Sequence, residues 1–387
     1  MTLPTLPPPI VIADALSLTA LAYELAQEPI VAVDTEANSL FAYRERVCLI
    51  QFSTRDRDYI VDPLALPDLG ELGPLFANPG QQKVFHAAEY DLIGLRRDYR
   101  FAFANIFDTM IAVRTLGLPQ MGLAALLEAR FDVKMNKRYQ RANWGKRPLT
   151  PDQLDYARLD THYLLPLRNS LNMELTTQGR LEEVYEEFAR IAQVAGEAKP
   201  AAIDRFWRIN GARDLTPSQA SVLREVYLYR ERQAERADHS PFKVMSEGTL
   251  MEIARGCPKT LSDLKEVTGM TQDQIRRHGG DLLQAVQLGL RTPAPPRPHI
   301  PRVPDEVRER YDRLHEWRKQ TAQGRGVESD VILPREALWE LARRVPSTLE
   351  ELDAIEQLGP WRRHSYGADI LKVLAEPAQP SNSELVS

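Results

Sequence analysis

The chain of 387 residues contains only two cysteines, Cys48 and Cys257, which are far apart in the sequence. They form no metal-binding or redox motif, and so few cysteines are typical of a reducing compartment. No apolar run approaches the ~20 residues that span a bilayer, and the start "MTLPTLPPPI" lacks the basic segment of a signal peptide. We therefore expect a cytoplasmic protein without a membrane segment.

The sequence also lacks an excess of positive charge. Its formal net charge is -5, which excludes a protein that coats nucleic acid by bulk charge. Residues 130–147, "RFDVKMNKRYQRANWGKR", are a local exception, because basic residues there are interleaved with Tyr139 and Trp144. Such a pattern suits a surface that follows phosphates and stacks on bases. A solvated basic loop has the same composition, so charge alone leaves both interpretations open.

The order of apolar patterns predicts a mixed α/β domain followed by helices. Short apolar runs bounded by polar residues predict five strands, "IVIA", "IVAVDTE", "VCLIQFST", "DYIVD" and "KVFHA". Helical spacing appears in "ALSLTALAYELAQE" and "AEYDLIGLRRDY", and helices dominate from Phe107 onward. Thr150 followed by Pro151 predicts the start of one of these helices. We expect this domain to end near residue 200.

The C-terminal half contains an internal repeat. Leu250–Val267 aligns with Leu338–Ile355 at an offset of 88 residues. An aromatic- and Arg-rich helical segment precedes each copy, which indicates two copies of one small helical module. The Pro-rich segment "TPAPPRPHIPRVP" between them predicts an extended linker, and the tail "EPAQPSNSELVS" predicts disorder.

Four acidic residues and one tyrosine are candidates for catalysis. Asp34 and Glu36 end a hydrophobic strand two residues apart, so both side chains lie on one face. Asp91 lies on a predicted helix, and Tyr156 and Asp160 are four residues apart, so they share one helix face. Each of these residues taken alone is more often a solvated or packed side chain. Their combination and order carry the functional signal.

The order Asp-x-Glu, helical Asp, then Tyr-x-x-x-Asp resembles the Tyr-bearing branch of the DEDD superfamily of 3'-to-5' exonucleases. The segments "VAVDTEANSLFAYRERVCLIQFST", "VFHAAEYDLIGL" and "NKRYQRANWGKRPLTPDQLDYARLDTHYLLPL", together with the paired modules, are similar to bacterial ribonuclease D. The modules resemble the helicase-and-RNase-D C-terminal (HRDC) domain. Ala142-Asn143 departs from the family's usual Ser-Asp, outside the carboxylate set.

The resemblance implies an α/β fold in which a ribonuclease H-like mixed-sheet exonuclease domain is followed by two all-α helical-bundle HRDC domains. The expected boundaries are 1–205 for the exonuclease domain, 206–292 for the first HRDC domain, 293–304 for the Pro-rich linker, 305–376 for the second HRDC domain and 377–387 for the disordered tail.

The resemblance also assigns roles to the candidate residues. Asp34, Glu36, Asp91 and Asp160 are expected to bind two Mg²⁺ or Mn²⁺ ions, consistent with the oxygen ligands that these cations prefer. Tyr156 is expected to orient the attacking water. Asp108 is expected to cap a helix. The expected RNA contacts are Lys137, Arg138, Tyr139, Arg141, Trp144 and His86, although a packed role at a strand end is an alternative for His86.

The family's activity is removal of 5'-mononucleotides from RNA 3' ends, notably those of tRNA precursors. Two alternatives remain open from the sequence: an inactive nucleic-acid-binding adaptor, and a DNA 3'-to-5' exonuclease. The complete set of four acids and a tyrosine favours an enzyme. No residue can be shown to contact the 2'-hydroxyl that distinguishes RNA from DNA, and the sequence gives no basis for naming a protein partner.

Overall fold

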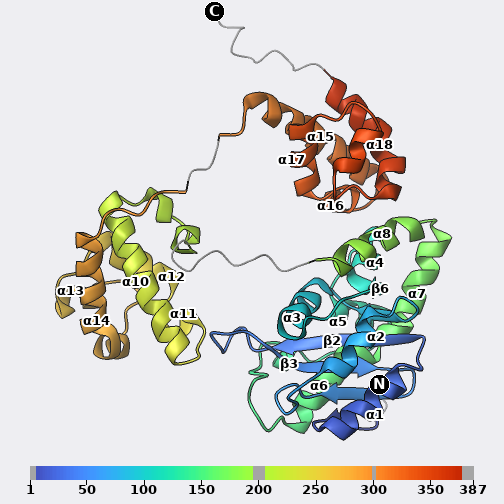
Figure 1. The fold of residues 1–387 in the computed structure, drawn as a ribbon, viewed down its shortest axis with the longest axis horizontal. Coiled ribbons are helices and arrows are strands. Elements are labelled where there is room, and N and C mark those ends of the chain that lie inside the picture. The colour runs from blue at the N-terminus through green and yellow to red at the C-terminus, as the bar shows by residue number, and fades with distance from the viewer. Residues whose placement is uncertain (1–5, 195–204, 299–301, 377–387) are drawn as a thin grey trace, which may run out of the picture. The chain divides into compact units, whose positions relative to one another are not determined.

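The computed structural model describes residues 6–194, 205–298 and 302–376 (Figure 1). The chain forms two compact units. One unit comprises Met1–Glu36, Val47–Ala195 and Arg302–Ser387, and the other comprises Ala37–Arg46 and Gly196–Pro301. The predicted domain boundaries stay predictions, and the predicted disordered tail, 377–387, is outside the described residues.

The N-terminal domain is built on a six-stranded mixed sheet with the order β1-β4-β3-β2-β5-β6. Strand β4 pairs in parallel with β1 and antiparallel with β3, while β5 pairs in parallel with both β2 and β6. The bounds are β1 Ile10–Ile12, β2 Ile30–Ala37, β3 Val47–Ser53, β4 Asp58–Val61, β5 Gln82–Phe85 and β6 Ile106–Asp108. The five predicted strands are confirmed. Strand β6 was missed because the helices expected from Phe107 onward overlap its residues.

Helices cover both faces of this sheet. They are α1 Ala15–Leu25, α2 Gly73–Ala77, α3 Glu89–Tyr99, α4 Thr109–Leu116, α5 Leu123–Phe131, α6 Pro151–His162, α7 Leu164–Thr177 and α8 Leu181–Ala192, with short 3₁₀ turns η1 Gly70–Leu72 and η2 Lys137–Tyr139. The predicted start of α6 is confirmed, because the Thr150 side chain accepts from the backbone N–H of Gln153 in a capping box. Asp108 caps α4 as predicted, accepting from the backbone N–H groups of Met110 and Ile111.

Alternation along the strands gives the sheet two different faces. The apolar face, which we define by Val31, Val33, Ile50 and Phe52, packs in one hydrophobic cluster with residues of α1 and α3. The opposite face, here called the polar face, is defined by Asp34, Glu36, Gln51 and Ser53 and is partly covered by α6. Its apolar members, such as Leu49 and Ile60, pack in a separate cluster with Ala157 of α6. One strand pattern therefore builds a core on one side and a polar layer on the other.

The remaining described residues form two helical modules with matching elements. The first contains α10 Pro217–Arg236, α11 Pro241–Val244, α12 Glu247–Gly256, α13 Leu261–Lys265 and α14 Gln272–Arg291, preceded by η3 Phe206–Arg208 and η4 Ala212–Asp214. The second contains α15 Asp305–Arg325, α16 Ser329–Ile332, α17 Arg335–Arg344, η5 Glu350–Ala354 and α18 Pro360–Ala375. Helices α12 and α17 are offset by 88 residues at both ends, as the sequence repeat predicts.

The repeat extends to unusual backbone positions. Cys257 ends α12 with φ 44°, and Val345, 88 residues later, ends α17 with φ 50°. A Cβ added at Gly279 would lie 2.7 Å from the Leu261 side chain, and one added at Gly367 would lie 2.8 Å from the Leu349 side chain. Both modules therefore require a glycine at the same close helix crossing. Within the described parts of the chain, no helix is long and apolar enough to cross a membrane.

Candidate active site

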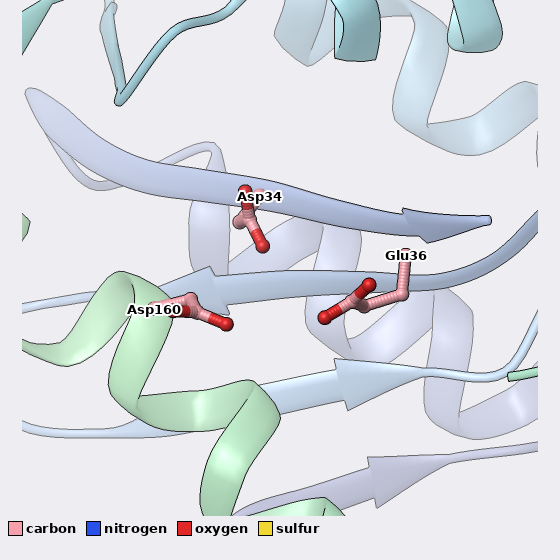
Figure 2. Close-up of side chains that lie close together, drawn as sticks. All are labelled: Asp34, Glu36 and Asp160. Atoms are coloured by element: carbon pink, nitrogen blue, oxygen red, sulfur yellow. The ribbon is translucent and has the colours of Figure 1, made fainter. Parts of the chain in front are cut away.

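The candidate site lies where β2 meets helix α6. Asp34 and Glu36 alternate with the buried Val33 of the apolar face, so both carboxylates extend from the polar face. Asp160 of α6 extends toward them (Figure 2). Ligand oxygens of these three carboxylates all lie within 4.8 Å of one another. The predicted convergence of residues more than 120 positions apart is therefore present.

Asp91 approaches the same site from α3, a helix that covers the apolar face. Its side chain is only 8% exposed. Thr35, which lies between the two acids of β2 and alternates to the other side of the strand, donates a hydrogen bond from Oγ1 to the Asp91 carboxylate. Asp91 is thus tied to the strand that carries Asp34 and Glu36, and its charge acts on both Glu36 and Asp160.

Burial and mutual repulsion make these carboxylates unusual acids. Burial, followed by the charge of Asp160, raises the pKa of Asp34 well above its ordinary value. Burial and the neighbouring acids do the same for Glu36 and Asp91. The pKa of Asp160 rises to about 7, chiefly through burial and then through the charge of Asp91. A divalent cation would relieve this repulsion, and a set of carboxylate oxygens is the donor chemistry that fits Mg²⁺ or Mn²⁺.

Tyr156 lies beside the carboxylates on α6, one helical turn before Asp160. Burial, followed by the charges of Asp160, Glu36 and Asp34, raises the pKa of the phenol. The hydroxyl therefore stays protonated at neutral pH and can donate a hydrogen bond. The ring stacks on Trp144, with centroids 6.0 Å apart and an interplanar angle of 29°. These aromatic contacts fix the phenol next to the acids.

Helix α6 is held onto the sheet by polar contacts that the sequence did not reveal. The Oγ of Ser53 on β3 lies within hydrogen-bond distance of Thr161 Oγ1, at 2.7 Å. Asp58 of β4 accepts from the same serine and lies 2.9 Å from Nδ1 of His162. Thr161 and His162 directly follow Asp160, so these bonds set the position of the Asp160 carboxylate. In the sequence, the only sign that Thr161 and His162 position Asp160 is that they directly follow it.

A cavity of about 430 Å³ opens beside the carboxylates. Its lining combines the acids and Tyr156 with the start of α5 and the segment before η2. The lining residues are Asp34, Thr35, Glu36, His86, Gly122, Leu123, Ala124, Ala125, Met135, Asn136, Lys137, Gln140, Tyr156 and Asp160. The lining therefore combines acidic side chains with apolar, amide and basic ones.

Of the predicted RNA contacts, Lys137 and His86 line this cavity. Lys137, Arg138 and Arg141 are exposed. His86 is largely buried, its Nδ1 lies 2.9 Å from Thr109 Oγ1, and burial lowers its pKa to about 4. The imidazole is thus neutral at physiological pH, so it can contact RNA only as a neutral group.

The position of Trp144 does not fit the predicted base-stacking role. Its side chain is 1% exposed and packs in a hydrophobic cluster with Leu49, Ile60 and Ala157. The prediction that Trp144 contacts RNA rested on the composition of residues 130–147. Composition does not show whether an aromatic side chain in a basic stretch points inward or outward. Tyr139 is partly buried and meets the Tyr156 ring edge-on at 6.1 Å. The aromatic residues of this stretch therefore support Tyr156, whereas Lys137, Arg138 and Arg141 face solvent.

The fold and site together define a 3'-5' exonuclease domain with helical appendages. Residues 9–176 match the family model described as "3'-5' exonuclease", and residues 219–286 and 307–374 match the HRDC domain. The chain belongs to the ribonuclease D family: it is 31% identical over 277 residues to ribonuclease D of Shewanella sp. (strain ANA-3), covering 71% of each chain. The predicted family, fold class and paired HRDC modules are confirmed.

Two further comparisons extend this result. The crystal structure of Escherichia coli RNase D, titled "an exoribonuclease involved in structured RNA processing", matches with a TM-score of 0.70 and 25% identity, covering 96% of this chain and 100% of that one. The exosome complex exonuclease RRP6 of Saccharomyces cerevisiae is 32% identical over 298 residues, which are 73% of this chain and 41% of that protein. Three RRP6-type proteins and one exosome component are among the relatives of this chain. The chain spans less than half the length of each of them.

Proposed function

We propose that this protein is a 3'-to-5' exoribonuclease that hydrolyses RNA 3' ends to 5'-mononucleotides. The observation that carries the proposal is the convergence of Asp34, Glu36 and Asp160, whose ligand oxygens lie within 4.8 Å of one another. Asp91 completes the set of four acids through its bond to Thr35. An inactive adaptor would have no need for four carboxylates that repel one another in a half-buried site.

Asp34, Glu36, Asp91 and Asp160 would hold two divalent cations. When bound, such ions neutralise the acids, activate a water molecule and stabilise the leaving 3'-oxygen. The carboxylates must be ionised for this purpose, so their raised pKa values oppose metal binding at low pH. The protein thus contributes a preformed cluster of oxygen ligands on a rigid strand and helix.

Tyr156 would orient the attacking water through a hydrogen bond from its phenol. The hydroxyl remains protonated at neutral pH, and its ring is held by Trp144 on one side and Tyr139 on the other. A nucleophile that is aimed in this way has a lower entropic barrier to attack. Tyr156 is therefore a catalytic residue in this proposal, because it touches the reacting water.

The RNA end would enter the cavity beside the acids. Lys137 lines the cavity, and Arg138 and Arg141 extend the positive charge along its exposed approach. These side chains can neutralise phosphates of the chain upstream of the scissile bond. The two HRDC modules would add contacts to structured RNA, so precursors of tRNA with 3' extensions are the proposed substrates.

One incubation series tests this function. The purified full chain is mixed with 3'-extended tRNA and with single-stranded DNA of matched length, each with Mg²⁺ and with excess chelator. We expect 5'-mononucleotides from the RNA only when metal is present. RNA binding without nucleotide release would indicate an adaptor. Faster release from the DNA would indicate a deoxyribonuclease.

A further inference from the structure

Gln51 is a buried polar residue in the middle of β3, and the proposed function assigns it no role. Its side chain is 0% exposed. Within residues 6–194, 205–298 and 302–376, neither Oε1 nor Nε2 of its carboxamide has a hydrogen-bond partner. A carboxamide in this state has lost its bonds to water without replacing them, which destabilises the fold. Buried polar groups without a partner are rare and call for a functional explanation.

The neighbours of Gln51 place it beneath helix α6. Leu49, two residues before it, packs with Ala157 of α6, and Ser53, two residues after it, bonds to Thr161. Because side chains two apart on a strand share a face, Gln51 points to the same side between these contacts. The residue paired with Gln51 on the neighbouring strand β4 is Ile60, which belongs to the hydrophobic cluster that contains Ala157.

This position is surrounded by the elements that carry the acids. Helix α6 covers Gln51 and bears Asp160 between Ala157 and Thr161. Strand β3 neighbours β2, which bears Asp34 and Glu36 on the same face of the sheet. A carboxamide supplies two N–H donors, and a bond from such a donor to an ionised carboxylate is stronger than one between neutral groups. Gln51 is therefore a neutral donor on the face of the sheet that carries the carboxylates of Asp34 and Glu36.

We propose that Gln51 is a positioning residue of the exonuclease site, whose Nε2 donates a hydrogen bond to the Asp160 carboxylate when divalent cations are bound. The inference rests on the proposed function. Gln51 acts through Asp160 and does not touch RNA. Its carboxamide destabilises the protein without metal and is retained because the loaded site uses it, a balance between stability and activity that is common in enzymes. The Asp160 ligand is then oriented from the sheet side as well as through Thr161 and His162.

The test replaces Gln51 by methionine, which conserves volume and removes both polar atoms. Gln81→Met is the matched control, because Gln81 is also buried (2% exposed) but donates 2.6 Å hydrogen bonds to the backbone oxygens of Leu25 and Glu28. For both full-length variants, thermal unfolding is measured with chelator and with saturating Mg²⁺. Steady-state release of 5'-nucleotide from RNA gives kcat and KM.

We expect Gln51→Met to raise the Tm measured in chelator by about 2–5 °C. We also expect it to reduce the additional stabilisation by Mg²⁺ and to lower kcat about 10- to 100-fold, with KM for RNA little changed. Gln81→Met should lower the Tm and leave the Mg²⁺ shift and kcat unchanged. In an Asp160→Asn background, Gln51→Met should no longer affect the Mg²⁺ shift.

Two results would overturn the inference. If Gln51→Met unfolds more easily in chelator or fails to fold, the carboxamide already stabilises the metal-free protein and its role is structural. If the variant is more stable but keeps the wild-type Mg²⁺ shift and kcat, Gln51 does not position the site. A wild-type protein that releases no nucleotide would contradict the proposed function instead, and the two Tm measurements would still decide the role of Gln51.

Discussion

The apolar and polar faces of the N-terminal sheet are made from alternate residues of the same strands, yet their side chains differ in how they affect stability. On β3, Ile50 and Phe52 contribute to a hydrophobic cluster, whereas Gln51 between them is buried without a hydrogen-bond partner in the part of the chain that the structure describes. On β2, Val33 is completely buried, and Asp34 next to it belongs to a group of acids that repel one another. The apolar face therefore stabilises the fold, and the polar face carries destabilising groups that the proposed chemistry would use.

The largest effect should follow replacement of an acid on the polar face. Asp34→Asn removes a charge from the cluster, so the variant should fold at least as well as the wild type without metal. Nucleotide release should fall by at least about 10³-fold, because a proposed metal ligand is lost. Single-turnover hydrolysis and thermal unfolding in chelator measure the two effects. Asp14→Asn, at the exposed cap of α1, is the matched control and should retain full activity.

The apolar face should respond in the opposite way. Phe52 is completely buried and contacts Phe76 with ring centroids 6.0 Å apart. Phe52→Ala should lower the free energy of unfolding by about 3–5 kcal/mol, since it opens a cavity in the core. At temperatures where the variant is still folded, its kcat should stay within a few-fold of wild type. Urea unfolding of the full chain measures the first effect. A large loss of kcat in the folded variant would contradict the separation of the two faces.

Tyr156 should give a smaller and purely catalytic effect. Tyr156→Phe keeps the ring that stacks on Trp144 but loses the phenol. We expect kcat to fall by roughly 10- to 1000-fold, as for the loss of one positioning hydrogen bond, with metal and RNA binding nearly unchanged. Tyr139→Phe serves as the control, because that hydroxyl lies 3.4 Å from Asp152 rather than among the four acids. Equal single-turnover rates for Tyr156→Phe and wild type would leave Tyr156 with a packing role only.

The smallest expected effect is on the pH dependence of stability. The pKa of Asp160 rises to about 7 in the folded protein from an ordinary value of 3.8. The folded state therefore binds more protons than the unfolded state between these values, and stability should fall as pH rises from about 4 to 7. Without metal, we expect the Tm to drop by roughly 2–6 °C over this range. Saturating Mg²⁺ and the substitution Asp160→Asn should each reduce the drop, as thermal scans at several pH values would show.

Local patterns were sufficient to predict the parts of the molecule that depend on spacing. Alternation placed Asp34 and Glu36 on one face, helical spacing paired Tyr156 with Asp160, and the offset of 88 residues predicted two matching modules. The structure has these elements, and the comparisons confirm the family. The catalytic and metal-binding roles of the residues remain predictions, because geometry shows that the acids meet but not what they bind.

The features that were missed depend on contacts between distant segments. The bonds that seat α6 join Ser53 to Thr161 and Asp58 to His162, pairs separated by more than 100 residues. No local pattern marks such pairs. Trp144 was misassigned because composition does not reveal which way a side chain turns, and it is buried against Leu49. Gln51 also passed unnoticed, since a single polar residue in an apolar strand gives no periodic signal.

The two helical modules allow an internal comparison within one chain. Cys257 and Val345 occupy equivalent helix ends with almost the same left-handed backbone, although neither is glycine and their side chains differ. Left-handed conformations are costly for such residues, most of all for the β-branched valine. The path of the backbone at this helix end is therefore common to both modules, although the residue that forms it is not. Exchanging residues between the modules at the 88-residue offset would separate what the shared architecture demands from what is particular to each module.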